Sequence, residues 1–175
     1  MFYFERPSDE PVSKNRYINF LIISIVIVYL MHLVDNIEEI TLGLSDFHSL
    51  IFKYGIGPFF EILLTLCAPI AFFLFWKKNK LGWIILGVYL IYNTLTPIVL
   101  LIWEQTRPPY LAPFETALPK HTIMYHMTWV LLYFALFIGI SNKSILLLYN
   151  IKLIVAIIVA SVTFLFVLVA YWSLL

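Results

Sequence analysis

Five long apolar runs constrain this chain more than any other feature of its sequence. A membrane-spanning helix needs about 20 mostly apolar residues, and the runs have this length: 17–36, 58–76, 81–103, 122–140 and 152–174. The chain is 62% hydrophobic and 12% charged, whereas soluble proteins carry about 25% charged residues. The sequence therefore predicts an all-α, polytopic membrane helix bundle with about five transmembrane helices. Residues 1–175 form a single integral-membrane domain in this interpretation, and 1–16 are its polar N-terminal segment.

The basic residues predict how the bundle is oriented. Eight of the 11 lie on the same side as the N-terminus (Arg6, Lys14, Arg16, Lys77, Lys78, Lys80, Lys143 and Lys152), and three lie on the other side (Lys53, Arg107 and Lys120). Cytoplasmic loops are enriched in Lys and Arg. We therefore expect a cell (inner) membrane protein with its N-terminus in the cytoplasm. The first run is followed by acidic residues rather than a small-residue cleavage site, so we expect it to be retained as an anchor.

Charge and cysteine content exclude several classes of partner and site. The net charge of +1 gives no indication of a nucleic-acid partner. The single cysteine, Cys67, excludes an internal disulfide and a cysteine-based metal site. It lies in an apolar run, where we expect a small packing residue.

Polar residues gather where the first run reaches the predicted outer side. His32, Asp35 and Glu39 are separated by three and four residues, which places them on one face of a helix. Such a set could bind a metal or perform acid–base chemistry. An ordinary solvated helix end, with the histidine bonded to a neighbour, is an equally good interpretation.

Glu61 and His126 lie deeper than a helix end requires. Each falls about one turn inside an apolar run, and a carboxylate at that depth is costly unless it has a partner or a task. For Glu61 a structural partner such as Lys53 or a tyrosine hydroxyl is the alternative. His126 lies five residues after His121, a spacing that turns the two imidazoles apart on a helix and makes a weak metal motif.

Six polar residues from four predicted helices are expected near one plane at the outer face of the membrane. They are His32, Asp35, Glu39, Glu61, Glu104 and His126. The candidate catalytic residues are Glu61, His126, His32, Asp35 and Glu39. The candidate ligands of a divalent metal (Zn²⁺, Fe or Mn²⁺) are His32, Asp35, Glu39 and His126. We expect the proline-rich residues 104–121 to cover this site.

Residues 32–39 also carry a resemblance. They read His-Leu-Val-Asp-Asn-Ile-Glu-Glu, which resembles the uncharacterised membrane proteins named for an H-x-x-E-E motif. In this chain Asp35 stands three residues before Glu38, and the histidine lies three residues earlier still. The resemblance covers under a tenth of the chain and implies no activity.

The sequence favours a membrane-embedded enzyme or a protein that binds a lipid-like or small ligand, in contact with membrane lipid. The alternative is a non-catalytic subunit of a larger membrane complex, because the last run is plain and has small residues for close packing. The candidate protein partners are other membrane chains, or further copies of this chain in a homo-oligomer. A small transporter or channel that uses Glu61, Asn93 and a kink at Pro97 ranks third, since the cytoplasmic half lacks matching polar residues. Haem bound between His32 and His126 is a fourth, narrow option.

Overall fold

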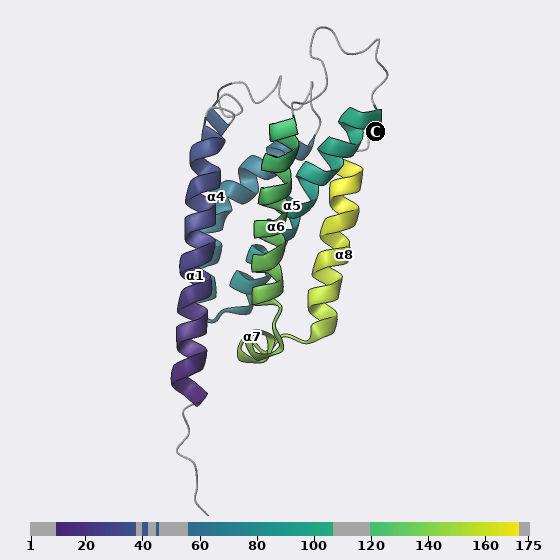
Figure 1. Ribbon diagram of the computed structural model, residues 1–175. Helices are drawn as coiled ribbons and strands as arrows, with labels where there is room; N and C mark the ends of the chain where they lie inside the picture. Colours follow the sequence, from purple (N-terminus) through teal and green to yellow (C-terminus); the bar gives the residue numbers. More distant parts are fainter. Residues whose placement is uncertain (1–9, 38–39, 42–44, 46–55, 107–119, 172–175) are drawn as a thin grey trace, which may run out of the picture.

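The computed structural model describes residues 10–37, 40–41, 45, 56–106 and 120–171, and their regular structure is helical (Figure 1). The helices are α1 (Glu10–Asp35), α4 (Ile56–Trp76), α5 (Lys80–Thr106), α6 (Lys120–Ile140), α7 (Lys143–Leu148) and α8 (Leu153–Ala170). All except the short α7 are long and apolar enough to cross a membrane. The all-helical fold and five candidate spans are thus confirmed. Insertion and orientation remain predictions.

Helix α5 is the centre of the bundle. In its candidate span 67% of the residues are buried, against 22–33% in the other four spans. It packs against α4, α6 and α8, whereas α1 lies against α4 and α6 (Figure 1). The outer helices present many large apolar side chains on their exposed faces. Such surfaces are expected where the surrounding solvent is hydrocarbon rather than water.

Several helix boundaries differ from the prediction, and two of them lengthen a helix by three residues or more. Helix α1 begins at Glu10, so residues 10–16, which the sequence assigns to a polar segment, extend the first apolar helix. Pro11 lies in the first turn, where its missing N–H costs nothing. Helix α5 continues to Thr106, three residues past the predicted end of its span.

A tight turn at residues 77–79 joins α4 to α5 and makes them antiparallel neighbours. Lys78 adopts a left-handed φ of 56°, and the amides of Lys78 and Asn79 donate to the carbonyls of Phe75 and Leu74. This is the Schellman arrangement that satisfies the last carbonyls of a helix. A Cβ on Gly82 would come within 2.3 Å of the Phe75 amide nitrogen, so only glycine allows this close approach.

The end of the bundle that carries Lys77, Lys80, Lys143 and Lys152, here called the lysine end, is closed by interlocked side chains. Trp83 is fully buried and donates its indole N–H to the Ile140 carbonyl at the end of α6 (2.8 Å). The short helix α7 returns beneath the bundle, where the Tyr149 hydroxyl donates to the Phe75 carbonyl and the two rings stack. Burial raises the pKa of the Tyr149 phenol, which therefore stays protonated as a donor.

A proline inside α4 is compensated by a side chain from α1. Pro69 has no N–H and therefore leaves the Thr65 carbonyl without its helical donor. The Tyr29 hydroxyl donates to this carbonyl at 3.3 Å, and its ring packs edge-on against Phe72. The contact fixes how α1 lies against α4, the two helices that supply His32 and Glu61.

Candidate functional site

Four helices enclose a cavity of about 190 Å³ at the other end of the bundle, here called the histidine end because His32, Glu61 and His126 lie there. The residues around it come from α1 (His32 and Asn36), α4 (Glu61), α5 (Asn93, Thr96 and Pro97) and α6 (Tyr125, His126, Trp129 and Tyr133). Six of these ten residues have an imidazole, amide, carboxylate or hydroxyl side chain (His32, Asn36, Glu61, Asn93, Thr96 and His126), three are tyrosine or tryptophan, and one is proline. A cavity bordered by so many polar side chains is unusual within helices of membrane-spanning character, because polar groups in a membrane are costly unless they are used.

His32 is held in one orientation by its own helix and by α6. The Asn36 side-chain nitrogen lies 3.2 Å from Nδ1 and 3.4 Å from Nε2 of the imidazole, and it also donates to the His32 carbonyl at 2.9 Å. An amide nitrogen is only a donor, so a ring nitrogen must accept from it. In the tautomer in which the nearer nitrogen, Nδ1, accepts, the neutral imidazole carries its proton on Nε2. Trp129 and Tyr133 meet this ring edge-on, with centroids 5.7 and 5.6 Å away.

The His32 Nε2–H faces the Glu61 carboxylate across a gap. Nε2 and Oε1 are 3.9 Å apart, and the two side chains are 11% and 31% exposed. This distance is too long for a direct hydrogen bond. A ligand atom could therefore accept from His32 and donate to Glu61 at the same time. The pair can also act as a donor and a proton acceptor toward a bound group.

Aromatic rings of α6 form one side of the cavity. Tyr125, Trp129 and Tyr133 are spaced four residues apart and therefore share a face of the helix. Trp129 stacks on Tyr133 (5.8 Å between centroids, 29° between planes) and meets Tyr125 edge-on at 6.1 Å. Tyr133 also approaches the hydroxyl of Tyr89 on α5, oxygen to oxygen at 3.5 Å. The result is a rigid aromatic surface along the cavity.

Helix α5 supplies polar groups beside a proline. The Asn93 amide is satisfied by the Tyr89 carbonyl at 2.8 Å. The Thr96 hydroxyl is buried near Tyr92 and Tyr171, yet it forms no hydrogen bond of ordinary geometry within the described part of the chain. A buried hydroxyl in this state carries a desolvation cost that a ligand could relieve. Pro97 and Asn93 both border the cavity.

The structure brings together three of the five predicted site residues. His32, Glu61 and His126 border one cavity. Asp35 lies at its margin, where it accepts a hydrogen bond from the Tyr125 hydroxyl at 2.6 Å and joins α1 to α6. Glu39 lies outside the described residues, and so does most of the predicted covering loop (107–119). Nothing is described of the Glu104 side chain either.

The expectation of a metal site is not supported. Among the residues that the structure describes, no three His, Cys, Asp or Glu side chains come close enough together to hold a metal ion. The reason is visible in two of the four predicted ligands. Asp35 is engaged with Tyr125, and the His32 ring is enclosed by Asn36 and the α6 aromatics.

Some residues near the site were not indicated by the sequence analysis. The spacing of Tyr125, Trp129 and Tyr133 is a visible signal, but aromatic residues at helical spacing are common in any apolar span. Tyr171 follows α8, the helix of the plain last run, and its hydroxyl lies 3.3 Å from that of Tyr92. Tyr92 donates in turn to the Gly57 carbonyl at 2.6 Å. The end of α8 is thus connected to the start of α4.

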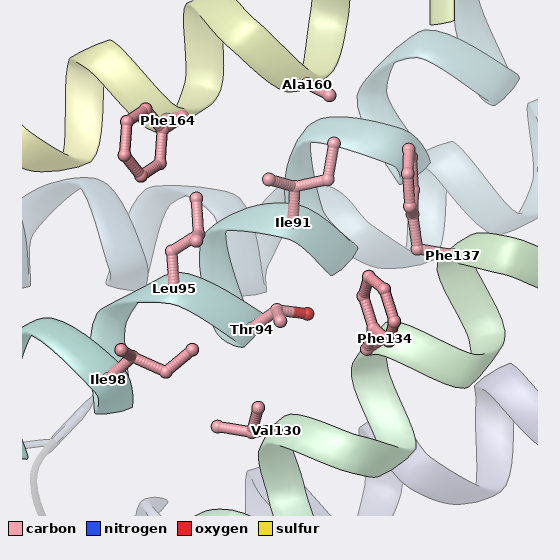
Figure 2. A pocket seen from close by; sticks show the side chains of 9 residues that line it. All are labelled: Ile91, Thr94, Leu95, Ile98, Val130, Phe134, Phe137, Ala160 and Phe164. Atoms are coloured by element: carbon pink, nitrogen blue, oxygen red, sulfur yellow. The ribbon is translucent and has the colours of Figure 1, made fainter. Parts of the chain in front are cut away.

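A second, apolar cavity of about 430 Å³ lies on a different face of α5, between α6 and α8 (Figure 2). It is bordered by Ile91, Thr94, Leu95 and Ile98 of α5, by Val130, Phe134 and Phe137 of α6, and by Ala160 and Phe164 of α8. Its one polar side chain, Thr94, already donates to the Leu90 carbonyl at 2.7 Å. We call it the apolar groove. It offers hydrocarbon contact and no polar recognition.

Comparison with known proteins gives no family. No protein family, no curated protein and no solved structure matches this chain. The functional argument therefore depends on the cavity at the histidine end alone.

Proposed function

We propose that this chain is an integral membrane protein that binds a small polar ligand, or the polar head of a lipid-like molecule, in the cavity at the histidine end. In this proposal the N-terminus is cytoplasmic and the ligand arrives from the outer side of the membrane. The observation that carries the proposal is that His32 and Glu61, with Nε2 and Oε1 3.9 Å apart, both border a cavity of about 190 Å³.

The cavity has the chemistry of a binding site rather than of a packing defect. Empty cavities in proteins are typically apolar, and an engineered apolar cavity of about 150 Å³ holds one benzene molecule. The cavity at the histidine end is slightly larger and offers the His32 donor, the Glu61 acceptor and the Thr96 hydroxyl. It therefore suits a compact group with hydrogen-bonding or charged character. A proton-transfer role for Glu61 on such a ligand follows from the same geometry.

Two threonines of α5 make a matched pair for testing this proposal. Thr96 borders the polar cavity, whereas Thr94 borders the apolar groove, and both are buried. Small molecules and lipids are extracted from each purified protein. We expect at least one of them to be bound both by the wild type and by Thr94→Val. The same molecule should be lost from Thr96→Val and Glu61→Gln. Mass spectrometry of the extracts provides the measurement.

A common result for all four proteins would contradict the proposal. If the extracts were identical, bound molecules would not depend on this cavity. Circular dichroism of each variant is the control, since a variant that had lost its helices would lose any ligand for that reason alone.

The alternative, a non-catalytic subunit of a larger membrane complex, would need a surface for another helix. The apolar groove is the obvious place, but Phe134, Phe137 and Phe164 border it, whereas close helix contacts in membranes favour small residues. We therefore place this alternative second. Its test is the mass of the protein in a mild detergent, where co-purifying chains would support it.

A further inference from the structure

The lysine end has a large excess of positive charge. The α4–α5 turn, α7 and the start of α8 lie at this end, as does the first part of α1 (Figure 1). Over the full sequence, eight of the 11 basic residues belong to this end but only three of the ten acidic residues, Glu5, Asp9 and Glu10. The resulting net charge of +5 already includes the acidic residues that precede α1 or begin it. The lysine end is therefore complementary to an anionic partner.

The basic side chains of this end are exposed. Among the residues that the structure describes, six of them are exposed and none of the six is paired with a carboxylate. They are Arg16, Lys77, Lys78, Lys80, Lys143 and Lys152. An anionic partner can therefore approach these charges without breaking an ion pair of the protein.

Exposed apolar side chains stand next to these charges. Four adjacent pairs join a basic residue to a large side chain that is itself exposed: Arg16 with Tyr17, Lys77 with Trp76, Lys80 with Leu81, and Lys152 with Leu153. The side chains of Trp76, Leu81 and Leu153 are 58%, 59% and 63% exposed. A soluble anion would leave this hydrocarbon in water, whereas a lipid covers it with an acyl chain and meets the lysine with its headgroup. The pattern therefore favours a lipid over a soluble anion.

Lys77 shows the depth at which the two kinds of surface meet. Its Nζ lies over the rings of Trp76 and Phe73, at 5.3 and 5.7 Å from their centroids. Both rings are more than half exposed, and Trp76 is the last residue of α4. Aromatic rings with a lysine amine beside them are typical of the level of the lipid headgroups. The end of α4 therefore marks the border between hydrocarbon and headgroup on this side.

Backbone contacts hold the basic segments in fixed positions relative to one another. The Phe75 carbonyl accepts from the Lys78 amide at 2.9 Å and also from the Tyr149 hydroxyl. The Ile151 amide donates to the Leu146 carbonyl at 2.8 Å and closes the turn that leads to Lys152. The α4–α5 turn and the start of α8 thus form one connected surface, which needs little ordering when a lipid binds.

We propose that the lysine end binds anionic lipids of its own membrane leaflet. The phosphate headgroups lie at Lys77, Lys80 and Lys152, and the acyl chains cover the exposed apolar side chains beside them. This surface is at the opposite end from the cavity, so the proposal rests on the proposed function only in requiring that the chain is inserted in a membrane.

Native mass spectrometry can count the bound lipids. The protein, purified in a maltoside detergent, receives equal amounts of phosphatidylglycerol and phosphatidylcholine with the same acyl chains. We expect the wild type to bind phosphatidylglycerol at least about fivefold more tightly, which corresponds to about 1 kcal/mol from one lysine at an anionic surface. A protein with Lys77→Gln, Lys80→Gln and Lys152→Gln should bind the two lipids equally. Arginine at the same three positions should keep the preference, because the charge is retained.

A matched control removes the same number of charges from the other end. A protein with Lys53→Gln, Arg107→Gln and Lys120→Gln has the same net charge as the glutamine variant of the lysine end. It should prefer phosphatidylglycerol as the wild type does. Circular dichroism confirms that each variant keeps its helices.

Four results would overturn the proposal. These are equal binding of the two lipids by the wild type, a preference that survives the three glutamines of the lysine end, displacement of the lipid by inorganic phosphate, and a second protein chain bound there in place of lipid. None of them affects the cavity, whose test depends on Thr96 and Glu61. Release of the chain from membranes by alkaline carbonate would instead contradict membrane insertion, on which both proposals depend.

Discussion

At the scale of single residues, the fold depends on side chains that satisfy backbone groups inside an apolar environment. Tyr29 donates to the Thr65 carbonyl that Pro69 leaves without a donor, and Trp83 donates to the Ile140 carbonyl at a helix end. In hydrocarbon no water can replace a missing partner. These hydroxyl and indole groups are therefore structural.

The Tyr29 contact can be tested with a double-mutant cycle. Tyr29→Phe removes the hydroxyl and keeps the ring, so it should lower the free energy of unfolding by about 0.5–1.5 kcal/mol. In a Pro69→Ala background the new backbone N–H can donate to Thr65, and the same change should cost less. Unfolding in mixed detergent micelles, followed by circular dichroism, measures both steps. An equal cost in the two backgrounds would show that the hydroxyl does not compensate for the proline.

At the scale of helices, two glycines that look alike in the sequence have different roles. A Cβ on Gly57 of α4 would fall 2.5 Å from Cζ of the Tyr171 ring, whereas a Cβ on Gly87 of α5 would meet its nearest neighbour, Val159, at 3.6 Å. The first distance is a clash and the second an ordinary contact. The helix ends at α4 and α8 therefore approach each other only because residue 57 is glycine.

We expect the two glycine variants to change stability in different ways. Gly57→Ala should lower the free energy of unfolding by about 1–3 kcal/mol, because the Tyr171 ring must move. Gly87→Ala should be neutral or raise it by up to about 1 kcal/mol, because alanine favours the helix. Thermal unfolding of both proteins in the same detergent makes the comparison. A Gly57→Ala protein as stable as the wild type would mean that α8 can shift without cost.

Hydropathy could predict how deep each residue lies but not which way it points. His32, Glu61 and His126 were expected near one plane, and they do border one cavity. The spacing predicts Asp35 on the same face as His32. Residues three apart nevertheless point in directions that differ by about 60° around the helix axis. That rotation separates a cavity residue from one at the margin that bonds Tyr125. Likewise, a polar segment such as 10–16 carries no hydropathy signal, although it continues α1.

At the scale of the whole molecule, the asymmetric distribution of charge predicts a definite orientation. The lysine end should face the cytoplasm and the histidine end the outside. Two exposed hydroxyl residues mark these ends, Ser144 in α7 and Thr41 beyond α1. Replacing either residue with cysteine changes no charge, so the substitution should not alter the orientation of the protein in the membrane.

In a Cys67→Ala background, Thr41→Cys should react with a membrane-impermeant thiol reagent added to intact cells. Ser144→Cys should react only after the cells are permeabilised. Mass tagging of the labelled thiol gives the readout. The reverse pattern would place the cavity at the histidine end on the cytoplasmic side, and labelling of both in intact cells would indicate mixed orientation.

The closed lysine end determines whether a solute can pass from one end of the bundle to the other. Trp83 and Tyr149 close that end with fully buried rings bonded to backbone carbonyls, so opening it would break two helix ends at once. A solute that enters at the histidine end must therefore leave by the same route. The ligand proposed for the cavity should therefore exchange with one compartment only, and vesicles that contain the protein should hold a concentration gradient of that ligand without leaking it.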